Sequence, residues 1–291
     1  MATTRDSRPK SVGQVLTAGH VLFSAGFGVV FPWVLAAELL ALLPFAPTGG
    51  IFDTDLSLLA DPGYLGRVLL LGVMQAFLYA IAVRRMAVLA GDAAPGAGLW
   101  PVLRVIPATV IGYICYELIV IIGLLFTFAF FMLGAFIIGP LAGVVLCVLP
   151  LAPTAAASTA LALFVFPAVL EGRGPFAALG ESSRLAKTAW VKVSLVISVP
   201  AVALLAAAVV TDMGGLMHGV SAGLDALRSS GDGGISMDQA GSLLSGFKVP
   251  VSNGGYDSWR IAGTLLSGVA WWYTLAVCYV QYRDLKDQPA A

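Results

Sequence analysis

One stretch of the chain constrains its fold more than any other: an apolar run of about 70 residues from Val102 to Leu170, in which only Arg104 and Glu117 are charged. About 20 apolar residues in a helix cross the hydrocarbon core of a bilayer, and core helices of soluble proteins are not apolar over such lengths. A helix also satisfies its own backbone hydrogen bonds inside lipid. The run therefore predicts an all-α membrane protein.

The composition extends this prediction to the rest of the chain. Of its 291 residues, 59% are hydrophobic and 11% are charged, whereas soluble domains have roughly 45–50% apolar and about 25% charged residues. A soluble fold could not bury so much apolar surface. Hydropathy predicts spans at 20–45, 65–90, 192–211 and 260–281, together with two spans inside 102–171.

Charge distribution decides the number of crossings. Basic residues flank the long apolar run on both sides, and Lys and Arg are enriched in cytoplasmic loops. Both flanks are therefore predicted to be cytoplasmic, which requires an even number of crossings between them. With six spans and both termini in the cytoplasm, twelve of the sixteen Lys and Arg residues lie inside, and the four outside are Arg67, Arg228, Lys248 and Arg260.

Prolines indicate where the helices of the long run break. A proline removes one backbone donor and clashes with the preceding turn, so we expect breaks at Gly139–Pro140 and between Pro150 and Pro153. Residues 130–152 then form either a kinked extension or a re-entrant piece. The sequence leaves both alternatives open.

The spans define the predicted domain organisation. Residues 1–19 are expected to form a cytoplasmic tail, residues 20–281 a single membrane domain, and residues 282–291 a second cytoplasmic tail. Within the membrane domain, an outer loop over 212–258 contains three glycine pairs that separate two weakly amphipathic stretches. We expect these stretches to form short helices on the outer surface.

An abrupt change from apolar to polar sequence predicts a surface helix after Glu171. Pro175 suits the first helical turn, because the N–H that proline lacks would have no partner there. Phe176, Leu179, Ala186 and Trp190 recur at helical spacing and predict one apolar face. Such a helix lies along the membrane, either as a solvated connector or as a basic docking surface for a partner or for anionic lipid heads.

The same stretch resembles the signature of a bacterial family. In FPAVLEGRGPFAALGESSRLAKTAW, the residues that match are Pro167, Glu171, Gly172, Gly174, Pro175, Ala178, Leu179, Ser182, Leu185 and Trp190. The C-terminal VQYRDLKDQ resembles the ending of the same group through Tyr282, Arg283, Asp284 and Leu285. This group comprises the YciC-like proteins and relatives that share the glycerophosphoryl diester phosphodiesterase membrane-domain fold. The resemblance covers about 30 residues well and implies a six-helix bacterial inner-membrane protein whose membrane domain carries no catalytic motif.

One group of polar residues is predicted near the middle of the membrane. Glu117 lies beside Tyr113 and Tyr116 in the third span, and Gln75 lies in the middle of the second. A carboxyl group at this depth must be protonated, paired or exposed to water. The group is either a structural contact between helices or a site for protons or substrate.

A second polar pair is predicted near the outer surface. Glu38 lies in the outer part of the first span and Arg67 at the outer entry of the second. The short loop between these antiparallel spans brings the two residues to similar depth, so we expect an ion pair. A structural pair with Arg67 reaching outward is the simpler interpretation.

Other features exclude several function classes. The formal net charge is zero and no basic block resembles a nucleic-acid footprint. The three cysteines lack the spacing of a metal site, and no nucleotide, protease or hydrolase motif occurs. We expect no cofactor, no metal and no enzymatic activity, but a role in envelope maintenance as a scaffold or assembly component. The expected partners are membrane lipids and a membrane protein or a second copy. The alternative is a transporter or lipid-handling protein that uses Glu117.

Overall fold

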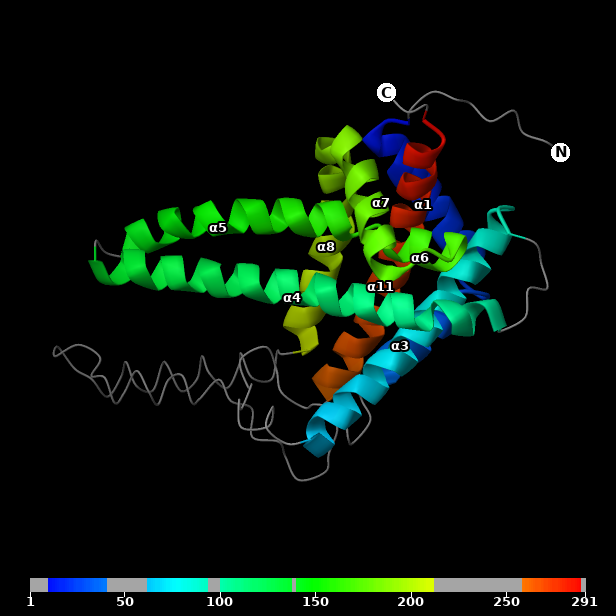
Figure 1. Cartoon of the computed structure of the whole chain (residues 1–291), viewed down its shortest axis with the longest axis horizontal. Coiled ribbons are helices and arrows are strands. Elements are labelled where there is room, and N and C mark those ends of the chain that lie inside the picture. The colour runs from blue at the N-terminus through cyan, green and yellow to red at the C-terminus, as the bar shows by residue number, and fades with distance from the viewer. Residues whose placement is uncertain (1–9, 41–61, 94–99, 138–139, 212–257, 289–291) are drawn as a thin grey trace. The chain divides into compact units, whose positions relative to one another are not determined.

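The computed structural model describes residues 10–40, 62–93, 100–137, 140–211 and 258–288. Every regular element among them is helical, as Figure 1 shows, so the all-α prediction is confirmed for this part of the chain. The helices are α1 (Val12–Gly26), α2 (Phe31–Leu39), α3 (Pro62–Leu89), α4 (Trp100–Ile137), α5 (Pro140–Leu161), α6 (Val165–Glu171), α7 (Pro175–Thr188), α8 (Trp190–Thr211) and α11 (Ser258–Lys286). The predicted outer loop over 212–258 lies almost entirely outside the described residues.

The chain forms two compact units, each assembled from segments that are distant in the sequence. The first unit contains Met1–Val34, Ala76–Ala201 and Trp272–Ala291, and the second contains Leu35–Gln75 and Val202–Trp271. Both α3 and α11 therefore contribute one end to each unit.

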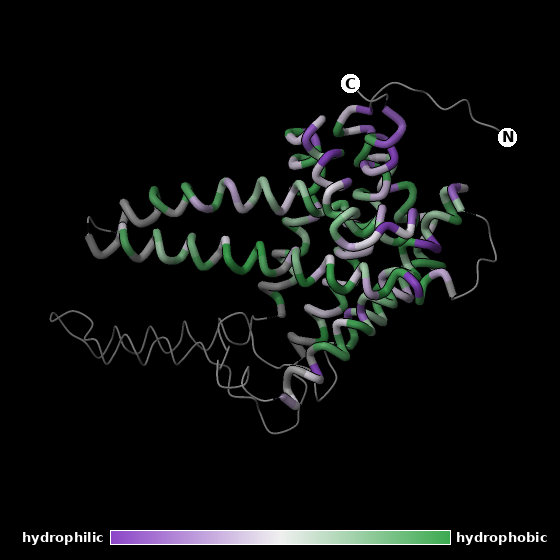
Figure 2. The backbone as a smooth tube through the Cα atoms, in the orientation of Figure 1, coloured by the Kyte–Doolittle hydropathy of each residue, from purple (hydrophilic) through white to green (hydrophobic). Residues whose placement is uncertain are grey.

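Length and composition allow four to six of the described helices to cross a membrane. Four single spans meet the criteria, at Leu69–Leu89, Pro101–Phe130, Val148–Glu171 and Ile261–Lys286. Two bent pairs qualify if each is one span: α1 with α2, bent by 84°, and α7 with the start of α8, bent by 107°. In Figure 2, hydrophobic residues predominate along α4 and α5. The described part of the chain is therefore all-α, and its long apolar helices indicate a polytopic membrane protein.

The helix break predicted between Pro150 and Pro153 is wrong. Both prolines lie inside α5, which runs without interruption from Pro140 to Leu161. Proline is tolerated in membrane helices when neighbouring helices and hydroxyl side chains compensate for the lost backbone bond. Here α4 packs along α5 so closely that a Cβ on Gly123 would lie 2.2 Å from Thr154 Oγ1. The other predicted break, at Gly139–Pro140, falls between α4, which ends at Ile137, and α5, which begins at Pro140; residues 138 and 139 lie outside the described residues.

A break that the sequence analysis missed separates α5 from α6. Residues 162–164 form a turn between the two helices. Pro167 follows directly, and the ring of a proline clashes with the carbonyl four residues before it, which here belongs to Leu163. The Phe166 N–H instead donates to the Leu163 carbonyl at 3.2 Å, in a tighter turn. The kink lies inside the span Val148–Glu171.

The first predicted span, 20–45, also differs from the structure. Its helix begins earlier, at Val12, because Ser11 and Gln14 form a capping box: the Gln14 N–H donates to Ser11 Oγ at 3.3 Å and the Ser11 N–H to Gln14 Oε1 at 2.8 Å. Residues 27–30 then form a turn before α2. The residues predicted as one span thus form two helices, and the first helix extends into the segment predicted as a tail.

The first unit is held together where α1 and α8 pack on α11. Val15, Val196, Val277 and Val280 form a buried cluster with one or more side chains from each helix. Gly19 lies so close to Val277 that a Cβ added to Gly19 would be only 2.9 Å from the Val277 Cα. This packing fixes the C-terminal end of α11, which carries Tyr282, Asp284 and Lys286.

Candidate functional site

The connection between α6 and α7 is built by two glycines and a proline. Gly172 ends α6 with φ +65°, a left-handed conformation that glycine adopts without steric cost. Its N–H and that of Arg173 both donate to the Pro167 carbonyl. Gly174 then caps α7, and Pro175 is its first residue, so the predicted helix start is confirmed.

The helix α7 is present, and the face that it packs against the protein differs from the predicted apolar face, which is expected to lie against the membrane. The side chains that α7 buries are Ala178, Ser182, Leu185 and Ala186. Phe176 is 74% exposed, and Trp190, which begins α8, is 53% exposed. Three of the four buried residues belong to the family-like signature, whereas signature residue Leu179 is half-buried. Hydropathy did not identify this buried face because one of its central residues, Ser182, is polar.

The Ser182 hydroxyl forms hydrogen bonds with two backbone groups next to the turn between α5 and α6. Its hydroxyl donates to the Ala160 carbonyl at 2.8 Å and accepts from the Leu163 N–H at 3.2 Å. The turn at 162–164 removes the usual helical partners of both groups, and a buried backbone group without a partner is costly. Ser182 is fully buried. The hydroxyl therefore holds α7 against the kink.

Replacing Ser182 by alanine is expected to destabilise the protein by about 2 kcal/mol, because one buried N–H and one buried carbonyl lose their partner. The measurement is unfolding of the purified protein in mild detergent by titration with a denaturing detergent. Ser183→Ala, one residue further along α7, is the matched control: Ser183 is half-buried, makes no hydrogen bond within the described residues, and should tolerate the change. Equal effects of the two substitutions would contradict the assigned role.

Glu171 joins the two stretches that resemble the family signature. Its carboxylate accepts from Arg173 Nε at 2.6 Å and from Lys286 Nζ at 2.6 Å, and also from the Tyr282 hydroxyl. The side chain of Glu171 is only 17% exposed. The end of α6 is thereby tied to the end of α11, across more than 100 residues of sequence.

Asp284 forms a second junction on α11. Its Oδ1 accepts from the backbone N–H of Lys10 at 2.9 Å, and its Oδ2 from Lys192 Nζ at 2.5 Å. The side chains of Asp284 and Lys192 are 5% and 17% exposed. This carboxylate connects α11 with α8 and with the residue that precedes the cap of α1.

Asp92 forms a third junction, just beyond α3. It accepts from Arg283 Nε at 2.8 Å and from the Tyr279 hydroxyl. We call Asp92, Glu171 and Asp284 with their partners the C-terminal polar network; the partners are Lys10, Arg173, Lys192, Tyr279, Tyr282, Arg283, Lys286 and Gln288. Figure 2 shows hydrophilic residues gathered near this end of α11.

Glu181 extends the network along α7. Arg184 holds its carboxylate with two hydrogen bonds, of 2.7 and 3.0 Å, and Arg173 lies 3.5 Å away. The bonds from Arg184 lower the pKa of Glu181 below its ordinary value of 4.5. Because the folded state favours the ionised form, these bonds stabilise the protein above pH 4.5 and are lost as the pH falls through the lowered pKa.

Acid is therefore expected to destabilise the wild-type protein more steeply than the Glu181→Gln variant below pH 4.5. The variant lacks the group that the folded state holds ionised, so this contribution to the pH dependence disappears. Unfolding in detergent at a series of pH values from 6 downward measures the difference. If the stability of the two proteins fell equally with decreasing pH, the ionisation of Glu181 would not be coupled to folding.

The mid-membrane residues take part in separate contacts. Gln75 donates through Nε2 to the Ala37 carbonyl at 3.2 Å, within the second unit. In the first unit, the rings of Tyr113 and Tyr116 contact Phe164 with centroids 5.2 and 6.4 Å apart. The side chain of Glu117 lies outside the described residues. A site at Glu117 stays a prediction.

The outer pair also stays a prediction. Glu38 Oε2 accepts from Ser267 Oγ at 2.7 Å, and Arg67 Nε donates to the Gly63 carbonyl at 3.2 Å. Both bonds lie in the second unit, where Gly268 brings α11 close to Leu35 of α2. These contacts tie α2 to α11 and hold Arg67 against its own helix.

The arrangement of charges in the C-terminal polar network joins neighbouring helices to one another. The carboxylates of the network accept from protein donors, and each sits at the end or just beyond the end of a helix. Within the described ranges, no group of three or more His, Cys, Asp or Glu residues is placed to hold a metal ion.

Sequence reasoning missed most of this network. The resemblance singled out Glu171, Tyr282 and Asp284 separately, but no pattern linked them to one another or to Asp92 and Lys192. A usable signal was present: charged residues recur at the ends of several predicted spans, where paired charges are expected. No family model, curated protein or solved structure matches the chain.

Proposed function

We propose that the protein is a non-enzymatic scaffold of a bacterial inner membrane that maintains the envelope as part of a larger assembly. The C-terminal polar network carries this proposal. Its charged groups pair with one another and fix the segments around α11, so they support architecture rather than turnover. The two stretches that resemble the YciC-like group meet in this chain, where Glu171 accepts from Tyr282 and Lys286, and this contact agrees with the role.

Six crossings with both termini in the cytoplasm complete the proposal. In this topology α1 with α2 is one bent span, and α8 crosses the membrane while α7 stays as an amphipathic helix at the cytoplasmic surface. It places twelve of the sixteen basic residues inside. The bend of 107° between α7 and α8 supports it, because a surface helix that leads into a span must turn by about a right angle. Reporter tags on the two termini test the topology, and tags on opposite faces would refute it.

The α4–α5 pair is the surface that we assign to the assembly. Only 12% of the apolar window in α4 and 17% of that in the α5–α6 span are buried within the protein. Large side chains such as Leu125 and Val148 are 63% and 56% exposed. In a membrane this surface faces lipid or the helices of a partner.

Site-specific photo-crosslinking in native membranes tests the scaffold role. A photoreactive residue at Leu125 or Val148 is expected to capture a membrane protein or a second copy of the chain. The matched control is Val21 of α1, which is 63% exposed and belongs to the same unit but not to the α4–α5 pair, and it should capture lipid only. Lipid adducts alone at all three positions would argue against an assembly.

Deleting the gene tests the physiological part of the proposal. We expect lower tolerance of envelope stress, restored by the wild-type chain. Normal tolerance would overturn envelope maintenance. Loss of flux of a solute in a Glu117→Gln variant, without loss of folded protein, would instead support the transporter alternative.

A further inference from the structure

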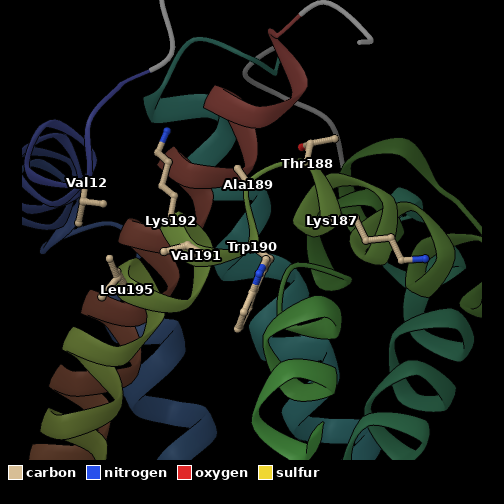
Figure 3. Close-up of a pocket in the computed structure, with 8 residues that line it drawn as sticks. All are labelled: Val12, Lys187, Thr188, Ala189, Trp190, Val191, Lys192 and Leu195. Atoms are coloured by element: carbon tan, nitrogen blue, oxygen red, sulfur yellow. The ribbon is translucent and has the colours of Figure 1, made fainter. Parts of the chain in front are cut away.

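A shallow cavity of about 440 Å³ lies at the bend between α7 and α8, as Figure 3 shows. The last residues of α7 and the first turns of α8 form most of its wall, and Val12 of α1 completes it. All of these residues belong to the first unit. The cavity uses none of the carboxylates of the C-terminal polar network.

The lining of this cavity is amphipathic. Lys187 and Thr188, at the end of α7, contribute the polar part. Val12, Val191 and Leu195 contribute an apolar part that continues along α8. A ligand that fits this lining has a polar head joined to an apolar chain.

The charge of the lining selects a negative head. No acidic residue lines the cavity, whereas two lysines do. Lys192 is paired with Asp284, but Lys187 is exposed and has no salt bridge or hydrogen bond to the described part of the chain. The cavity therefore has an uncompensated positive charge, which attracts an anionic group.

The position of the cavity selects a lipid rather than a free anion. It lies where a polar helix meets an apolar one, which in a membrane protein is the level of the lipid headgroups. Trp190 stands at this bend and is 53% exposed, and tryptophan is enriched at the membrane interface. We propose that the bend between α7 and α8 binds the headgroup of an anionic phospholipid, with its phosphate near Lys187 and an acyl chain along Val191 and Leu195.

This inference goes beyond the scaffold role and depends only on the protein lying in a membrane. Native mass spectrometry of the full chain in detergent measures the lipid binding. The protein is titrated with phosphatidylglycerol or with phosphatidylcholine of the same acyl chains. We expect the wild type to retain phosphatidylglycerol preferentially. Lys187→Gln should weaken that binding about fivefold, since each lysine near a lipid surface contributes about 1 kcal/mol, and Lys187→Arg should retain it.

The control variant is Arg85→Gln, which removes an exposed positive charge from α3 outside the cavity. It should bind phosphatidylglycerol like the wild type. Equal retention of the two lipids, or equal losses in Lys187→Gln and Arg85→Gln, would overturn the proposal. Displacement of phosphatidylglycerol by inorganic phosphate at the same concentration would assign the site to a free anion instead. None of these outcomes depends on the envelope phenotype or on a protein partner.

Discussion

Replacing Asp284 by asparagine is expected to lower the free energy of unfolding by about 3 kcal/mol, because the ammonium group of Lys192 is then left without its counterion. The side chains are only 17% and 5% exposed for Lys192 and Asp284, so water compensates little of the loss. Asparagine has nearly the same shape as aspartate and can still accept a hydrogen bond from the Lys10 N–H. The substitution therefore removes only the negative charge. Detergent unfolding measures the change.

Two further variants distinguish this effect from general damage to α11. Replacing both partners, with Lys192→Met and Asp284→Leu together, should cost less than Asp284→Asn alone, because an apolar pair leaves no buried charge. Lys286→Met removes a cation that is 49% exposed and bonded to Glu171. It should lower the free energy of unfolding by about 1 kcal/mol or less, because exposed ion pairs contribute no more than that. A double variant as unstable as Asp284→Asn would refute the argument.

A methyl group at Gly19 is expected to destabilise the protein by about 2 kcal/mol through overpacking. The added Cβ would lie 2.6 Å from Val277 Cγ2 and 2.9 Å from Val277 Cα. The side-chain atom can rotate away, but the backbone atom cannot, so α1 and α11 must separate. Gly19→Ala is the variant to measure, again by unfolding in detergent.

The same helix provides the control for this substitution. Gly13 also lies in α1, but a Cβ there meets nothing within 4 Å. Gly13→Ala should therefore be neutral or stabilising by up to about 1 kcal/mol, since alanine favours the helix. The assigned packing would be contradicted if both glycines responded alike.

Several elements could be predicted from the sequence because their causes are local. The start of α7 follows from Gly174 and Pro175, whose backbone preferences act within one turn. The division of the long apolar run near Pro140 follows in the same way. The capping box of Ser11 and Gln14 is equally local; it was readable from the sequence, although the predicted span began later.

Other elements could not be predicted because their causes are distant in the sequence. Pro150 and Pro153 do not interrupt α5, because the neighbouring α4 and the membrane setting outweigh the local tendency to break. The buried face of α7 depends on Ser182, whose partners are created by a kink about 20 residues earlier. Because serine is polar, no local sequence pattern predicts that this side chain is buried.

The sequence by itself determined that this is an all-α protein of the membrane, because hydrophobicity and helix signals add up residue by residue along the chain. Only the tertiary structure decided which charges meet. Glu171 reaches Tyr282 and Lys286, and Asp284 reaches Lys192, through helices that pack beside α11. Such pairing depends on how helices associate, and that association is governed by close contacts such as Gly19 on Val277, which hydropathy does not encode.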